Sequence, residues 1–202
     1  DHSRWSEVYD RVQSLGVVFD SGGSCANTIA TIGRLGAQAR YCGQVGDDNL
    51  GEMYAQRLLE HCGGHRLQVS SATPTGKCLS LVSPRDAERT MVTDLGAALT
   101  LPSIGSFAED LQHTKIAHFT GYTLLDGPMR PIATEAIRLA HEAGTFVSLD
   151  AADPFVVDLT RDLARAGGVS GDQVIDPLVT GNQSTDATGK GSDCHHYGVV
   201  CG

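Results

Sequence analysis

The stretch from Ser21 to Gly36 constrains the fold of this chain more than any other part of its sequence. Gly22 and Gly23 allow the backbone to turn sharply and to come close to another group. The residues after them predict a helix without charge until Arg34. Apolar and small side chains recur along this helix at helical spacing in two stripes, which predicts that both stripes are buried. The stripes are Ile29, Ile32, Leu35 and Ala26, Ala30, Gly33, Ala37.

The start of this buried helix is a candidate site for polar ligands. The first turn of a helix has free N–H groups and a partial positive charge, which suit oxygen-rich ligands. Asn27 adds a side chain that can both donate and accept hydrogen bonds. The structural alternative is a plain glycine turn followed by a helix that Ser24 caps. This stretch by itself leaves the two interpretations open.

Composition narrows the class of protein. A chain of 202 residues is long enough to bury one good core, and we expect one domain. The net charge of −9 argues against a nucleic-acid or anionic-membrane partner. The six cysteines lack C-x-x-C spacing, which predicts reduced thiols in a cytosolic protein. We recognise no signal peptide or transmembrane run, so the predicted localisation is cytoplasmic.

The order of predicted elements indicates the fold class. Strand, helix and strand patterns over 115–119, 130–143 and 145–149 predict a parallel sheet covered on both faces. Residues 66–94 are instead predicted as a set of antiparallel hairpins. The other predicted elements are helices over 4–14, 49–61, 103–112 and 158–166, and strands over 16–19 and 39–45.

Several short motifs, taken together in their order and spacing, resemble the PfkB family of carbohydrate and nucleoside kinases. The resemblance covers roughly residues 18–155 and is nearest to the adenosine-kinase-like branch. The motifs are Gly22-Gly23-Ser24-x-x-Asn27-Thr28, Arg34-Leu35-Gly36, Gly43-x-Val45-Gly46-Asp47-Asp48-x-x-Gly51, Thr73-Pro74-Thr75-Gly76, Glu88-Arg89-Thr90-Met91 and Leu95-Gly96-Ala97-Ala98.

The resemblance implies an α/β, Rossmann-like ribokinase fold, in which helices flank a mostly parallel sheet that carries a small β-lid. Residues 1–160 would be the substrate-side part of this domain. The lid segments would lie at about 16–20, 39–45 and 66–94. Residues 161–202 would form a truncated or divergent tail.

The resemblance also implies a substrate site. Gly22, Gly23, Ser24 and Asn27 would bind sugar hydroxyls, although Asn27 could instead only cap the first turn. Cys78 and Tyr122 fall at positions that wall the base or sugar pocket in adenosine kinases, although core packing is the commoner role for such residues.

Arg89 would reach the transferring phosphoryl group when the lid closes, because a planar and permanently charged guanidinium suits phosphate oxygens. The alternative is a solvated hairpin arginine paired with Glu88 or Asp94. For the acidic residues after Gly46 we favour a helix cap over a ligand site.

The tail contains a distorted version of the family's second signature, with one inserted residue and Lys190 in place of alanine. By this resemblance Gly189 and Gly191 would form an anion hole, and Asp193 would take the proton from the attacking hydroxyl. The alternative is a flexible, acidic, glycine-rich tail. We predict no metal site at Cys194, His195, His196 and Cys201, because paired ligand spacing is absent.

The expected function is transfer of the γ-phosphoryl group of ATP, with Mg²⁺, to a hydroxyl of a sugar or nucleoside. The family's first strand and an Asn-x-x-Glu element do not match this sequence, so we expect impaired turnover. A non-catalytic sugar- or nucleoside-binding remnant is the alternative. A homodimer through the lid fits the unpaired lid edges. A nicotinamide-dependent enzyme is disfavoured, because no G-x-G-x-x-G follows a strand.

Overall fold

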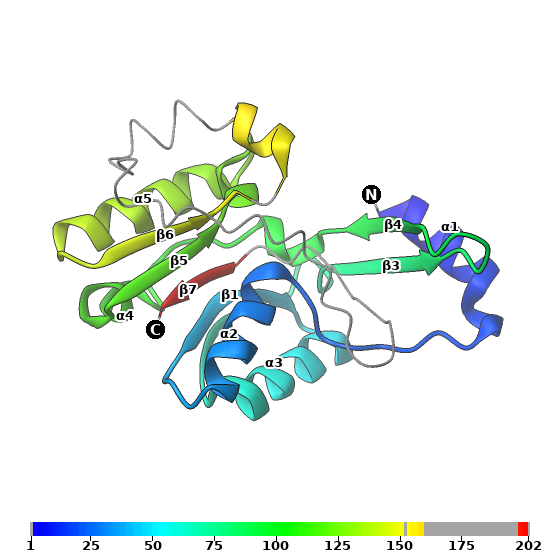
Figure 1. The fold of residues 1–202 in the computed structure, drawn as a ribbon, viewed down its shortest axis with the longest axis horizontal. Coiled ribbons are helices and arrows are strands. Elements are labelled where there is room, and N and C mark those ends of the chain that lie inside the picture. Colours follow the sequence, from blue (N-terminus) through cyan, green and yellow to red (C-terminus); the bar gives the residue numbers. More distant parts are fainter. Residues whose placement is uncertain (1, 152, 160–197, 202) are drawn as a thin grey trace.

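A five-stranded sheet forms the centre of the molecule (Figure 1). The computed structural model describes residues 2–151, 153–159 and 198–201. The strands of this sheet are β1 (Arg40–Gly46), β2 (His65–Ser70), β5 (Ile116–Thr120), β6 (Phe146–Asp150) and β7 (Gly198–Cys201), in the spatial order β2-β1-β7-β5-β6. The pairs β1–β2 and β5–β6 are parallel, and β7 runs antiparallel to both β1 and β5. The carboxyl ends of the four longer strands therefore lie at the same edge of the sheet. The predicted, mostly parallel sheet is confirmed.

Helices cover both faces of this sheet. Neighbouring residues on β1 point to opposite sides, as strand geometry requires. The buried Tyr41 packs with helices α2 (Ser24–Arg34) and α3 (Asn49–Cys62). The buried Cys42 belongs to the core cluster that contains α4 (Ala108–His113) and α5 (Met129–Glu142). The chain therefore has two core layers, one on each face.

A two-stranded antiparallel hairpin projects from this body and is called the lid below. It consists of β3 (Lys77–Val82) and β4 (Arg89–Asp94), and helix α1 (His2–Val12) packs beside it (Figure 1). The buried Asp94 carboxylate binds His2 Nδ1 at 2.8 Å and Lys77 Nζ at 3.1 Å. Lys77 Nζ also lies 4.9 Å from the ring centroid of Trp5. These contacts fasten α1 to the lid.

The lid is smaller than predicted. Residues 39–45 and 66–70 belong to the central sheet, because α3 carries the chain from β1 back to a parallel β2, with Tyr41 opposite His65. The strand expected over 16–19 is also wrong. After the short 3-10 helix η1 (Gln13–Leu15), residues 17–23 have no regular structure, and no described strand pairs with them. Only 77–94 forms the lid hairpin.

Some helix boundaries also differ from the prediction. Helix α4 begins only at Ala108, after a turn in which Phe107 N–H donates to the Ile104 carbonyl. Leu35 is 81% exposed, because α2 already ends at Arg34 and Gly36 turns the chain with a φ of +84°. Residues 154–159 are helical, and the rest of the helix expected over 158–166 lies outside the described residues.

Two other sequence expectations can be compared with the described residues. Cys25, Cys42, Cys62 and Cys78 are free thiols. No described helix combines the length and the apolar character that spanning a bilayer would need.

Candidate functional site

Helix α2 begins at a glycine that no other residue type could easily replace. Gly23 has a φ of +113° and is the N-cap residue, and its carbonyl accepts the first helical hydrogen bond from Asn27 N–H at 2.9 Å. The expectation that Ser24 is the N-cap is therefore wrong. Ser24 already lies inside the helix, and no side chain among the described residues caps this end. The first-turn N–H groups thus start the helix without a carboxylate or hydroxyl cap.

The first turn of α2 lies beside the carboxyl ends of β5 and β6. Cys25 is fully buried, and its thiol interacts with the backbone of Thr120, the last residue of β5. Burial, together with the negative charge of Asp150, raises the pKa of Cys25 to about 12. This thiol therefore stays protonated at neutral pH, and it packs rather than reacts.

Thr120 and Asp150 are polar residues at this edge to which the sequence prediction gave no role. They are direct partners in the β5–β6 register. Thr120 is 1% exposed, and its hydroxyl has no hydrogen-bond partner among the described residues. Their positions directly after the strands predicted over 115–119 and 145–149 are the signal that could have identified them, because ligands of open α/β sheets bind beyond the carboxyl ends of strands.

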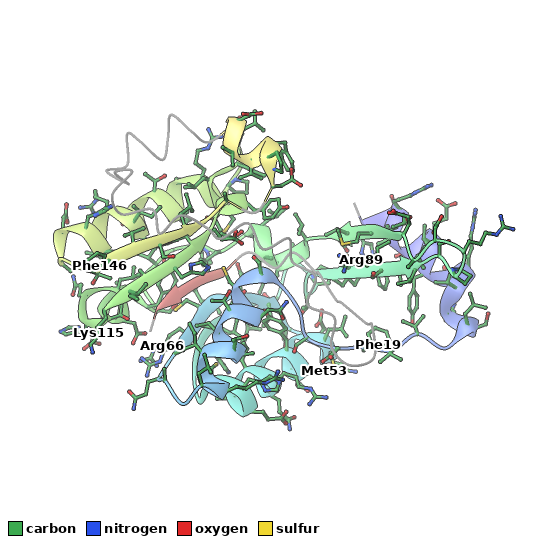
Figure 2. All side chains as sticks on the ribbon, in the orientation of Figure 1. Phe19, Met53, Arg66, Arg89, Lys115 and Phe146 are labelled. Atoms are coloured by element: carbon green, nitrogen blue, oxygen red, sulfur yellow. The ribbon has the colours of Figure 1, made fainter. Side chains whose placement is uncertain are left out.

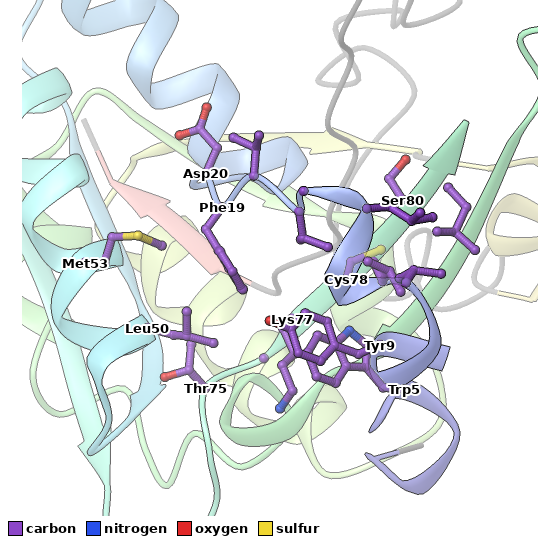
Figure 3. A pocket seen from close by; sticks show the side chains of 18 of the residues that line it. Trp5, Tyr9, Phe19, Asp20, Leu50, Met53, Thr75, Lys77, Cys78 and Ser80 are labelled. Carbon is purple, nitrogen blue, oxygen red and sulfur yellow. The ribbon is translucent and has the colours of Figure 1, made fainter. Parts of the chain in front are cut away.

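A cleft of about 530 Å³ lies between the lid and the body (Figure 3). Its walls come from four segments: α1, residues 15–20, the start of α3, and the strand β3 with the residues before it. Most of the lining is apolar, and Asp20, Lys77 and Ser80 add polar groups. Figure 3 shows Phe19 reaching between Met53 of α3 and the side chains of β3. The cleft therefore combines a broad apolar surface with a few polar groups, which is typical of small-molecule sites.

The predicted substrate residues divide between the cleft and the start of α2. Cys78 lines the cleft. Gly22 is buried and lies next to the cleft. The hydroxyl of Tyr54, a cleft residue, donates to the Gly22 carbonyl at 3.3 Å. Gly23, Ser24 and Asn27 do not line the cleft, and the Asn27 side chain is exposed on the first turn of α2.

Two further predicted residues, Arg89 and Tyr122, are not part of the cleft lining. Arg89 is exposed at the start of β4, where it pairs with Val82 at the end of the hairpin remote from the body (Figure 2). Tyr122 is half-buried in the 3-10 helix η3 (Gly121–Leu124), with its ring 6.1 Å from that of Phe155. Neither residue lines the cleft.

The predicted phosphotransfer residues Gly189, Gly191 and Asp193 lie outside the described residues. The same holds for the side chains of Cys194, His195, His196 and Cys201. Within the described part of the chain, no three His, Cys, Asp or Glu side chains come together as a metal site would require.

Comparison with known proteins shows the family to which this chain belongs. The family model for pfkB family carbohydrate kinases matches residues 5–166. The chain belongs to this family. The pfkB assignment agrees with the motifs in the sequence, and it covers the lid, the start of α2 and the carboxyl edge of the sheet.

Individual pfkB relatives share the fold but are longer. "Probable fructokinase-4" of Arabidopsis thaliana is 29% identical over 138 residues, which is 67% of this chain and 42% of that protein. The adenosine kinase of Sinorhizobium meliloti superposes with a TM-score of 0.66 and 34% identity, over 82% of this chain and 52% of the other. A probable sugar kinase from Rhizobium etli CFN 42 gives 0.71 and 33%, over 86% and 52%. The ribokinase-like α/β fold is confirmed, and the chain spans about half the length of these relatives or less.

Proposed function

We propose that this pfkB protein transfers the γ-phosphoryl group of ATP to a hydroxyl of a sugar or nucleoside. The carrying observation is the uncapped start of α2, which faces the carboxyl edge of the sheet beside a cleft roofed by the lid. The names of the relatives, fructokinase and adenosine kinase, support a hydroxylated acceptor.

Most of the residues predicted from the sequence have a role in this proposal. The amides after Gly23, with the side chains of Ser24 and Asn27, bind the hydroxyls of the acceptor. Cys78 and Tyr122 bound the space for the base or sugar, and Arg89 neutralises phosphate charge after the lid moves toward the body. Gly189, Gly191 and Asp193 would supply the anion hole and the base. The buried Thr120 hydroxyl and Asp150 add polar groups at the same edge.

ATP and Mg²⁺ enter the proposal through the family. The described residues do not include a cluster that fits a metal ion, so Mg²⁺ would arrive bound to the nucleotide phosphates, and we assign no step to a protein-held metal. Apart from Asp150, the described residues given a role here supply backbone amides, neutral side chains and the Arg89 guanidinium, which can orient hydroxyls and compensate phosphate charge but do not by themselves remove a proton.

A coupled assay of ADP release tests the proposal. The purified chain is supplied with Mg²⁺-ATP and, separately, with fructose, ribose and adenosine. We expect ADP release that depends on the acceptor and falls at least about tenfold in Asn27→Ala, because one lost hydrogen bond to a bound hydroxyl has about that effect. ADP release that is the same with and without every acceptor would count against the proposal.

A binding protein without turnover is the second candidate. The mostly apolar lining of the cleft, which offers few polar groups for catalysis, favours it. Calorimetry with the same three acceptors separates the two functions. Heat of binding with no ADP release supports the binding protein, whereas absence of both binding and turnover contradicts both candidates. Gln56→Ala is a suitable control, because Gln56 is exposed on α3 and outside the cleft.

A further inference from the structure

Asp48 connects the body to the lid as well as capping a helix. Its Oδ1 accepts from Gly51 N–H at 2.9 Å, which is the N-cap bond of α3. The same carboxylate accepts from the Thr75 hydroxyl at 2.6 Å through Oδ1 and from Thr75 N–H at 2.8 Å through Oδ2. Thr75 lies two residues before the first residue of the lid strand β3 and is 2% exposed. One side chain thus holds the first turn of α3 and the root of the lid.

The root of the lid is packed backbone against backbone around this carboxylate. The Thr75 hydroxyl accepts from Gly46 N–H at 2.9 Å, and the Pro74 carbonyl accepts from Ala97 N–H at 2.8 Å. A Cβ added at Gly46 would collide with the backbone of Pro74 and Thr75, and one at Gly96 would collide with the Pro74 carbonyl. Both lid strands therefore attach to the body through a few closely fitted residues.

The two elements that Asp48 joins form opposite walls of the cleft. Leu50 and Met53 line it from the first turns of α3, whereas Lys77 and Cys78 line it from β3 (Figure 3). Whatever fixes Thr75 relative to α3 also fixes the distance between these walls.

We infer that Asp48 is a positioning residue, which sets the angle of the lid over the cleft through its bonds to Thr75. The inference rests on the geometry of the lid root and does not depend on the proposed function. It goes beyond helix capping, because an N-cap needs only one acceptor oxygen, whereas the second oxygen and the charge of Asp48 are directed to Thr75.

Substitutions at Asp48 and at Thr75 separate the lid contact from the helix cap. Asp48→Ser keeps an oxygen for Gly51 N–H, since serine is a good N-cap residue, but it lacks the second oxygen for Thr75 N–H. Thr75→Val removes the hydroxyl and keeps the shape of the side chain, whereas Thr75→Ser keeps the hydroxyl. Asp47→Asn is a matched control for charge, because Asp47 is exposed and contacts the Ser70 carbonyl through its backbone N–H.

Hydrogen exchange measured peptide by peptide tests the inference. We expect Asp48→Ser and Thr75→Val to speed exchange at least about tenfold over residues 73–98, because each loses a buried hydrogen bond. Exchange in α5 and β5 should stay as in the unchanged protein, and Thr75→Ser and Asp47→Asn should leave the lid root unchanged.

Three results would overturn the inference. Acceleration spread evenly over lid and body would show a purely structural role for Asp48. Unchanged exchange at the root would show that the contact does not hold the lid, and equal effects of Thr75→Ser and Thr75→Val would exclude the hydroxyl as the cause. If Asp48→Ser fails to fold, the two Thr75 variants decide the question between them.

Discussion

Helices α2 and α3 begin at the same edge of the same sheet face, yet their first turns differ in every respect. Helix α2 starts from Gly23 without a side-chain cap. Helix α3 starts from Asp48, whose carboxylate binds Gly51 and Thr75. At the third helical position α2 has Ala26 and α3 has Gly51. The first-turn amides of α2 have no side-chain cap, whereas the first turn of α3 is capped by the Asp48 carboxylate.

This difference separates two uses of a helix start. The partial positive charge is similar at both ends, but at α3 a carboxylate of the chain already compensates it. A ligand at α3 would have to displace Asp48 together with its lid contact. At α2 no side chain of the described part of the chain caps the first turn, so polar ligands are expected there. Four substitutions or measurements can break or sharpen this comparison.

The largest effect is expected from exchanging the residues at the third position. A Cβ at Gly51 would collide with the Gly46 carbonyl and lie 3.0 Å from the Thr75 hydroxyl. Gly51→Ala should therefore lower the free energy of unfolding by about 3 kcal/mol or more. Ala26→Gly in α2 should cost only about 1 kcal/mol, mainly through helix propensity. Urea unfolding measures both, and equal losses would contradict the comparison.

Removal of the capping side chains should have the next largest effect. Asp48→Ala loses the helix cap and leaves Thr75 without its acceptor, which should cost about 2–4 kcal/mol of unfolding free energy. Ser24→Ala should change it by less than about 0.5 kcal/mol, because Ser24 is not a cap. Thermal unfolding of the two variants measures the difference. A large loss in Ser24→Ala would mean that its hydroxyl stabilises the helix in another way.

Whether a feature of these two helix starts could be predicted from the sequence depends on how far apart along the chain the contacting residues lie. The Asp48 cap of α3 is a local signal, and it is confirmed. The pairing of β2 with β1 was missed, because alternating residues over 66–72 fit a hairpin as well as a parallel strand. The uncapped start of α2 was missed too. Serine is a common N-cap residue, so the sequence favoured Ser24 as the cap, whereas Gly23, with its positive φ, is the N-cap in the structure.

The contents of the site were harder to predict than the fold. The residues that carry the pfkB resemblance are consecutive motifs, whereas the cleft brings together α1, residues 15–20, α3 and β3 from distant parts of the chain. The second contact of Asp48 spans 27 residues to Thr75, and no local pattern encodes it. Sequence reasoning therefore identified the cap and missed the connection to the lid.

A smaller effect is expected from pH. Burial alone would raise the pKa of Asp48, but hydrogen bonds from Thr75 and Gly51 and the charge of Lys77 outweigh it and hold the pKa below its usual value. A lowered folded-state pKa adds stability that is complete above the unfolded value of about 4 and is lost as the pH falls through the folded value. Stability should thus fall as the pH drops from just above the unfolded value through the lowered folded-state pKa.

Asp48→Asn removes this contribution while keeping an acceptor for the cap. We expect the variant to lose less stability than the unchanged protein over the same pH range, as measured by urea unfolding at several pH values. Asp47→Asn serves as the control, because the carboxylate of this exposed neighbour makes no hydrogen bond to any described residue. A steeper pH dependence in Asp48→Asn would show that the carboxylate is destabilising when charged.

The smallest effect on stability is expected at the residue with the greatest proposed importance for binding. Asn27 is exposed, and its backbone already takes part in the helix through the Gly23 carbonyl. Asn27→Ala should therefore change the free energy of unfolding by less than about 0.5 kcal/mol. If the open start of α2 binds an acceptor, saturating ligand should raise the thermal midpoint of the unchanged protein and should raise that of Asn27→Ala less. Equal ligand-induced shifts would place the acceptor elsewhere, and a marked loss of stability without ligand would make Asn27 part of the fold, so that both helix starts would be structural.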